Sequence, residues 1–123
     1  MSEIESQHIY QLALKLQREI FEMTKSLPTE ERFSLSFQIR KASRMIGAKI
    51  ADSWYKRRYT AYSLAKLSDA CSECAKTRHW LQTCVDCGYL DAARFESLTK
   101  QCLVILDELN SKIRESESWQ ISL

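Results

Sequence analysis

Four cysteines in two C-x-x-C pairs, Cys71/Cys74 and Cys84/Cys87, have the spacing that most directly indicates chemistry. Two such pairs are typical of a zinc site, in which four thiolates surround one ion. Here all four lie in one continuous helical pattern, and Cys74 and Cys84 are ten residues apart, roughly 15 Å along a helix axis. The first pair is expected to face the core and the second to face away from it. We therefore expect small apolar side chains rather than metal ligands.

Other catalytic residue types do not converge. His8 and His79 fall in different helical segments, and Glu-x-x-His, the spacing found in di-metal carboxylate bundles, does not occur. A Cys–His nucleophile pair stays open as an alternative, but histidines at a surface or interface are the simpler interpretation. We predict that the protein is not an enzyme and has no catalytic residues, no bound metal and no cofactor.

Basic residues concentrate between residues 25 and 58. This stretch carries nine basic and three acidic residues, a net +6, whereas the rest of the chain carries −4 and the whole chain +2. Several of these basic groups alternate with aromatic side chains, a combination that suits phosphate contact and base stacking. The residues predicted to bind nucleic acid are Arg40, Lys41, Arg44, Lys49, Lys56, Arg57 and Arg58. A solvated face, or pairing with acids of a neighbouring subunit, stays open as the alternative.

Long helices must position these residues. The chain has 123 residues, enough for one domain, and its two Gly and one Pro are too few for the turns of a β-sandwich or for a Gly-rich phosphate loop. Apolar residues recur with helical spacing in four segments, which predicts helices at about 3–26, 30–57, 60–87 and 91–116, followed by a polar C-terminal tail. Short connections favour antiparallel neighbours, so we expect an all-α, up-down-up-down four-helix bundle that forms a single domain over residues 1–123.

Single residues indicate where these helices begin and end. Pro28 ends the first helix, Thr29 is expected to cap the second, Gly88 ends the third and Asp91 caps the fourth. Gly47 lies inside the second helix, a position that often marks a close approach between helices.

Three helices carry apolar residues away from the stripe that faces the core. A small bundle cannot bury both sides of two helices, so the second stripe predicts an oligomer interface. The candidate interface residues are Phe33, Phe37, Tyr55, Tyr62 and Trp80. The alternative is that these rings lie flat on the surface of a monomer. The core stripe of the third helix includes one charged residue, Arg78, which is expected to pair with Asp107 or Glu108.

The sequence also bears on compartment. The longest apolar run is only a few residues, so no membrane-spanning helix is predicted. The first residues are polar and acidic, unlike a signal peptide, and an odd count of five cysteines fits reduced thiols. A cytoplasmic protein with no membrane partner is expected.

Two regions of the chain, within residues 24–43 and 72–90, resemble a known family. Residues 24–35 (TKSLPTEERFSL) and 38–43 (QIRKAS) are similar to its T-K-x-F-P turn, followed by E-x-F-G-L and Q-I-R-R-A. Residues 72–81 (SECAKTRHWL) and 87–90 (CGYL) are similar to its S-E-x-x-E-T-x-x-W-L and G-Y-L. The chain resembles, over nearly its whole length, the four-helix-bundle proteins encoded in intervening sequences of bacterial 23S rRNA genes.

The sequence departs from the family pattern at three places. Residues 49–53 read KIADS where the family has N-I-A-E-G, Ser34 replaces a Gly, and Lys76 replaces the second Glu of the third-helix motif. A contact that depends on the family's Asn and Glu is therefore in doubt, and Lys49 makes this position more basic.

The resemblance implies a ring-shaped homo-oligomer, a pentamer. It also implies kinship with the accessory variability determinant of diversity-generating retroelements, which binds a reverse transcriptase and nucleic acid. Two hypotheses follow. One is a non-enzymatic ring that holds RNA or DNA on its basic second helix, and the other is a protein–protein adaptor that docks a partner enzyme such as a reverse transcriptase.

Overall fold

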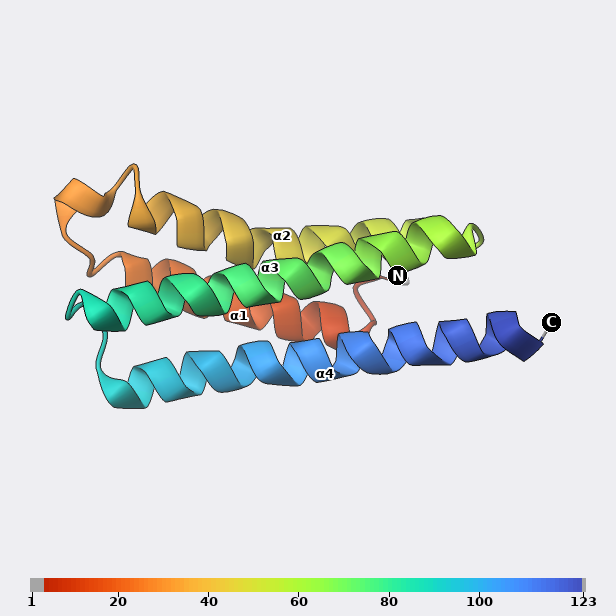
Figure 1. Cartoon of the computed structure of the whole chain (residues 1–123). Helices are drawn as coiled ribbons and strands as arrows, with labels where there is room; N and C mark the ends of the chain where they lie inside the picture. Colours follow the sequence, from red (N-terminus) through yellow and green to blue (C-terminus); the bar gives the residue numbers. More distant parts are fainter. Residues whose placement is uncertain (1–3, 123) are drawn as a thin grey trace.

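The structure, a computed structural model, describes residues 4–122, with side chains as far as residue 116. This part of the chain forms four α-helices and no strand (Figure 1): α1 (His8–Thr24), α2 (Leu35–Tyr55), α3 (Thr60–Asp86) and α4 (Ala92–Ser122). A short 3₁₀ helix, η1 (Thr29–Glu31), lies between α1 and α2. None of the described helices is long and apolar enough to cross a membrane.

The helices pack around a common axis. Helix α2 contacts α1 and α3, and α4 contacts α3 and α1, so each helix lies against two neighbours. In Figure 1 the colours of successive helices progress in opposite directions along the bundle. The result is a bundle whose inner faces enclose one core.

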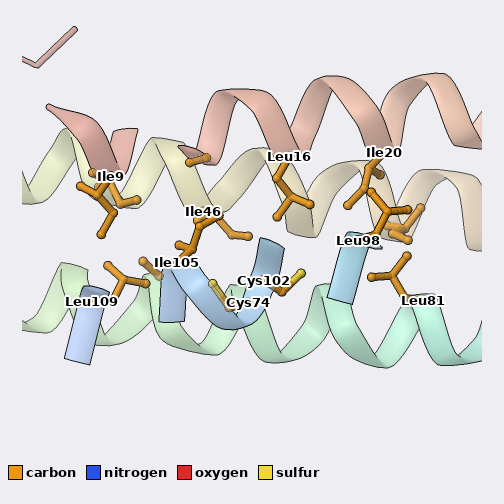
Figure 2. Close-up of a cluster of buried hydrophobic side chains, with 14 of the residues drawn as sticks. Ile9, Leu16, Ile20, Ile46, Cys74, Leu81, Leu98, Cys102, Ile105 and Leu109 are labelled. Atoms are coloured by element: carbon orange, nitrogen blue, oxygen red, sulfur yellow. The ribbon is translucent and has the colours of Figure 1, made fainter. Parts of the chain in front are cut away.

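The core is built from one apolar stripe on each helix. Figure 2 shows ten labelled side chains gathered between the helices: Ile9, Leu16 and Ile20 of α1, Ile46 of α2, Cys74 and Leu81 of α3, and Leu98, Cys102, Ile105 and Leu109 of α4. Each is 3% exposed or less. Burying one Leu or Ile contributes roughly 1.5–3 kcal/mol, so this stripe supplies much of the free energy that holds the helices together.

The first turns of the chain differ from the prediction. A helix was expected from residue 3, which lies outside the described residues, but residues 4–6 form a turn and α1 begins at His8. The turn is closed by the Gln7 amide, which donates to the Ile4 carbonyl at 3.1 Å. It brings Ile4 back onto the bundle, where it is 4% exposed, and burial of this side chain favours the turn over a further helical turn.

The second helix begins five residues later than predicted. Thr29 starts only the 3₁₀ turn, in which Pro28 holds the N-cap position, and α2 begins at Leu35 because the backbone at Ser34 leaves the helical region. The Ser34 hydroxyl donates to Glu31 Oε1 at 2.7 Å, a local bond of the kind by which serine competes with helix formation. The break leaves Phe33 in the bend between η1 and α2, exposed to solvent.

The same carboxylate ties the η1 bend to the end of α3. The Tyr89 hydroxyl donates to Glu31 Oε2 at 2.9 Å. Hydrogen bonds from Ser34 and then Tyr89 hold the pKa of Glu31 below its ordinary value, and the bond to Glu31 raises the pKa of Tyr89 to about 12.

The turn between α3 and α4 follows the prediction. Gly88 has φ of 77°, the left-handed conformation that ends helices, and its amide donates to the Val85 carbonyl while the Tyr89 amide donates to the Cys84 carbonyl. Asp91 caps α4 by accepting a hydrogen bond from the Arg94 amide at 2.8 Å. Helix α4 then continues to Ser122, so the expected polar tail after residue 116 is helical.

The register of α3 corrects two predictions. Thr77 and Cys84 are fully buried, whereas Arg78 is exposed and forms no ion pair among the described residues. Thr77 fits the core because its hydroxyl donates to the Glu73 carbonyl at 2.8 Å, which satisfies the polar group. The buried stripe of α3 therefore runs through Thr77 rather than Arg78, and it turns Cys84 inward instead of outward.

Candidate nucleic-acid interface

Three of the predicted ligands gather on one face of the N-terminal half of α2. Arg40, Lys41 and Arg44 border a shallow hollow of about 450 Å³. We call this hollow the η1–α2 groove, and its lining residues are Arg32, Phe33, Phe37, Arg40, Lys41, Arg44 and Met45. It exists because the break at Ser34 turns η1 away from the axis of α2, so that Arg32 and Phe33 stand beside the first two turns of that helix.

Beside the groove, the aromatic ring of Phe21 in α1 is in contact with three basic side chains. The Phe21 ring has Arg40, Lys25 and Arg44 at 4.7, 4.9 and 5.5 Å from its centroid. Arg40 Nε also donates to the Thr24 hydroxyl at 2.7 Å, and that hydroxyl donates to the Phe21 carbonyl at 2.8 Å. Arg40 therefore fastens α2 to α1 and is fixed in place before any ligand arrives.

The aromatic rings of the groove are open to water. Phe33 is 85% exposed and Phe37 is 52% exposed. The Arg32 guanidinium lies 5.2 Å from the Phe33 ring centroid, and the Lys41 ammonium lies 6.0 Å from that of Phe37. Cations and ring faces thus alternate along this edge of the molecule.

The groove is positive because its cations have no carboxylate partners. The ion pairs within residues 4–116 do not include Arg32, Arg40, Lys41 or Arg44. Lys49, farther along α2, is different, since its ammonium lies 3.6 Å from Asp69 of α3. Lys49 is therefore neutralised across the α2–α3 contact, and the structure separates it from the groove.

The remaining predicted ligands lie at the other end of α2. Lys56 and Arg40 are sixteen residues apart, roughly 25 Å along the helix axis. Arg57 is held locally, because it donates to the Trp54 carbonyl at 2.9 Å and lies 4.2 Å from the Trp54 ring centroid. Arg58 is exposed. The seven predicted ligands therefore form two basic clusters and one neutralised lysine, not one site.

The predicted interface aromatics are divided in the same way. Tyr55 and Tyr62 lie at the end of the bundle that carries Lys56, whose ammonium is 5.6 Å from the Tyr62 ring centroid. Trp80 is half-buried against the core and meets His79 edge to face at 4.8 Å. Phe33 and Phe37 belong to the η1–α2 groove. The sequence analysis thus assigned Phe33 and Phe37 to an oligomer interface and three basic residues of α2 to nucleic-acid binding, although all five line one groove.

Sequence reasoning missed Arg32, Lys25 and Phe21 as members of this cluster. Arg32 and Lys25 lie within the basic stretch, but the turn after Pro28 hides their relation to α2 in the linear pattern. The signal that identifies Phe21 is its position four residues before Lys25 on the same helix face, which brings ring and ammonium together.

Three of the five cysteines are apolar side chains of the core, whereas Cys71 is half-buried and Cys87 is exposed. Cys74, Cys84 and Cys102 are fully buried. Burial raises the pKa of all three thiols, that of Cys84 to about 11 and that of Cys102 to about 12. Such thiols stay protonated and are poor nucleophiles and poor ligands. Helix α3 is continuous through Cys71, Cys74 and Cys84, and among the described residues no group of three or more His, Cys, Asp or Glu is arranged to hold a metal ion.

The four helices around one core define the class of the protein as an all-α bundle. Residues 5–111 match the family model of the 23S rRNA-intervening sequence protein, and the chain belongs to this family. The resemblance of the two sequence motifs is thereby confirmed. No curated protein matches the chain.

A solved structure has the same fold. The chain is similar to the crystal structure of a protein of unknown function from the S23 ribosomal protein family of Bacteroides thetaiotaomicron. The two chains are 26% identical with a TM-score of 0.78, and the match covers 85% of this chain and 97% of that one.

Proposed function

We propose that the protein is a non-enzymatic, cytoplasmic homo-oligomer that binds nucleic acid through the basic face of α2. The observation that carries the proposal is the η1–α2 groove, where Arg32, Lys41 and Arg44 have no carboxylate partner among residues 4–116 and stand beside exposed rings. Phosphates supply the charge that these cations lack, and release of counterions drives the association.

The proposed assembly is a ring of five subunits, and each subunit is a bundle of four helices in antiparallel, up-down-up-down order. A ring repeats each groove around its axis, so a chain of net charge +2 presents a continuous basic belt. A contact that buried the groove would have to bring acids from the neighbouring subunit, since none within residues 4–116 pairs with its cations and a buried charge without a partner is costly. We assign Tyr55 and Tyr62, at the other end of the bundle, to subunit contact and leave Phe33 and Phe37 to nucleic acid. Trp80 borders a hollow together with Lys41 and Met45, so we leave it out of the subunit contact.

Charge reversal tests the proposal. Fluorescence anisotropy with labelled RNA and DNA at about 50 mM salt is expected to show binding that weakens steeply with salt. The double variant Lys41→Glu/Arg44→Glu is expected to lose about tenfold or more in affinity, since each lost phosphate contact removes part of the counterion release. The matched control Arg78→Glu/Arg94→Glu makes the same change of charge on α3 and α4, both residues being exposed, and should alter affinity far less.

A second candidate function is an adaptor that docks a partner enzyme such as a reverse transcriptase. A different surface favours it: Leu103 and Val104 of α4 are 44% and 41% exposed, and Val104 lies in a second hollow with Leu12 and Ile105. Failure of the wild-type protein to bind any RNA or DNA at low salt would leave this function as the better one. The diagnostic variant is then Val104→Lys, which should weaken capture of a purified partner.

A further inference from the structure

The η1–α2 groove offers a ligand two kinds of contact at once. Its cations lack carboxylates in the described part of the chain, and its two phenylalanines are 85% and 52% exposed. Phe33, at 85% exposure, adds nothing to the core, and its nearest described ring partner is Arg32. A ligand that fits the groove must therefore bring negative charge and flat unsaturated faces together.

The two forms of nucleic acid differ in this respect. A duplex presents its phosphates on the outside and keeps its bases stacked on one another, so it satisfies the cations but leaves the rings in water. A single strand carries the same phosphates and has bases that are free to stack on aromatic side chains, whatever their sequence. The stacked base removes apolar ring surface from water and gains contact energy that a duplex does not offer.

The groove is also prepared for such a ligand. Arg40 is held by Thr24 at 2.7 Å and by the Phe21 ring at 4.7 Å, and the bend that carries Phe33 is held by the bonds of Glu31 to Ser34 and Tyr89. A groove whose bend and neighbouring helices are fixed beforehand loses less conformational entropy when nucleic acid binds, although Arg40 itself is not one of the phosphate contacts.

We propose that the η1–α2 groove binds single-stranded nucleic acid in preference to duplex. Bases stack on Phe33 and Phe37, and the phosphates between them contact Arg32, Lys41 and Arg44. The inference deepens the proposed function and rests on it, because it names the form of nucleic acid that the same groove takes.

The test compares single strands with duplex on the same protein. The probes are a labelled 20-nucleotide oligo-U, a labelled oligo-dT of the same length and a labelled 20-base-pair duplex of mixed sequence, each titrated by anisotropy at about 50 and 200 mM salt. Both single strands are expected to bind more tightly than the duplex. The variants Phe33→Ala and Phe37→Ala are each expected to lose roughly 5- to 150-fold in single-strand affinity, the usual range for one stacked base, and to bind the duplex as wild type does. Phe33→Leu keeps an apolar side chain without a ring and should lose nearly as much as Phe33→Ala.

Three results would overturn the inference, and they are distinguishable. Equal affinity for strand and duplex, with no effect of the phenylalanine variants, removes the preference but keeps nucleic-acid binding. Binding of no probe removes the proposed function as well. Loss of the oligomer in Phe33→Ala, measured by light scattering, together with equal losses for strand and duplex, assigns the rings to subunit contact instead. Because Phe33 lies outside the core, its replacement does not threaten folding.

Discussion

At the scale of single residues, Arg40 is a predicted nucleic-acid contact that also has a structural role. Its charge and its place on α2 predict phosphate contact, but its Nε donates to Thr24 and its guanidinium lies over Phe21. We expect Arg40→Ala to lower the free energy of unfolding by about 1–2 kcal/mol, through loss of a charged hydrogen bond and a cation–π contact. Lys41→Ala, one residue away and exposed, should change it by less than about 0.5 kcal/mol.

Urea denaturation of the Arg40 and Lys41 variants at one protein concentration is the measurement, since the stability of an oligomer depends on concentration. Equal stability of the two variants would show that Arg40 does not fasten α2 to α1. Affinity for nucleic acid should rank in the opposite order, with Lys41→Ala weaker than Arg40→Ala, because only Lys41 is free to follow a phosphate.

Glu31 gives the protein a stability that depends on pH. The pKa of its carboxyl is lowered by hydrogen bonds from Ser34 and then Tyr89, so its contribution is complete above the ordinary glutamate pKa of about 4.3 and is lost as pH falls through the lowered value. The stability difference between wild type and Glu31→Gln should therefore be largest near neutral pH and shrink in acid. Thermal unfolding at pH 7, 5 and 3 measures it, and a difference that grows toward pH 3 would contradict the sign.

At the scale of the elements, periodicity predicted four helices because a core stripe repeats along each of them. It failed where a polar side chain satisfies itself locally. Thr77 bonds its own helix and enters the core, which displaced the predicted stripe of α3 toward Arg78. Ser34 bonds Glu31 and interrupts a pattern that looks continuous from residue 30. Neither bond leaves a trace in the spacing of apolar residues, so neither could be predicted from it.

Replacing each of the two glycines by Ala is expected to change the free energy of unfolding in opposite directions. A Cβ added at Gly47, inside α2, would meet Ala13, Gln17 and Tyr10 at 3.7–3.8 Å, which is ordinary contact, so Gly47→Ala should raise the free energy of unfolding by about 0.5–1 kcal/mol. Gly88 has φ of 77° after α3, and Gly88→Ala should lower it by about 1–2 kcal/mol. Chemical denaturation of both variants checks the pair, and a loss of stability in Gly47→Ala would show that α1 and α2 approach too closely for a methyl group.

At the scale of the whole molecule, the uneven distribution of charge along the chain could be predicted from the sequence. Which basic residues pair with other side chains and which do not could not be predicted. The +6 stretch is visible in the sequence. The fold then neutralises Lys49 with Asp69 and commits Arg57 to Trp54. These contacts join residues on different helices or turns, so composition cannot reveal them. Lys56 and Arg58 also stand outside the ion pairs of residues 4–116, but the larger cluster without carboxylates is the η1–α2 groove. In the proposed ring, its position at one end of the bundle would place one groove per subunit along a single edge.

The assembly is the last prediction. Tyr55 and Tyr62 are 63% and 42% exposed on the end of the bundle opposite the η1–α2 groove, and rings of this size are placed in contacts more often than in water. Light scattering at micromolar concentration should give about 72 kDa, five times the chain mass of 14.4 kDa. The mass should hold at about 0.5 M salt because apolar contacts are not screened. Tyr55→Glu/Tyr62→Glu should shift it toward a single chain, whereas Arg58→Glu at the same end should leave it unchanged. A wild-type mass near that of one chain would contradict the ring, and with it the argument that repetition turns a weakly charged chain into a basic belt.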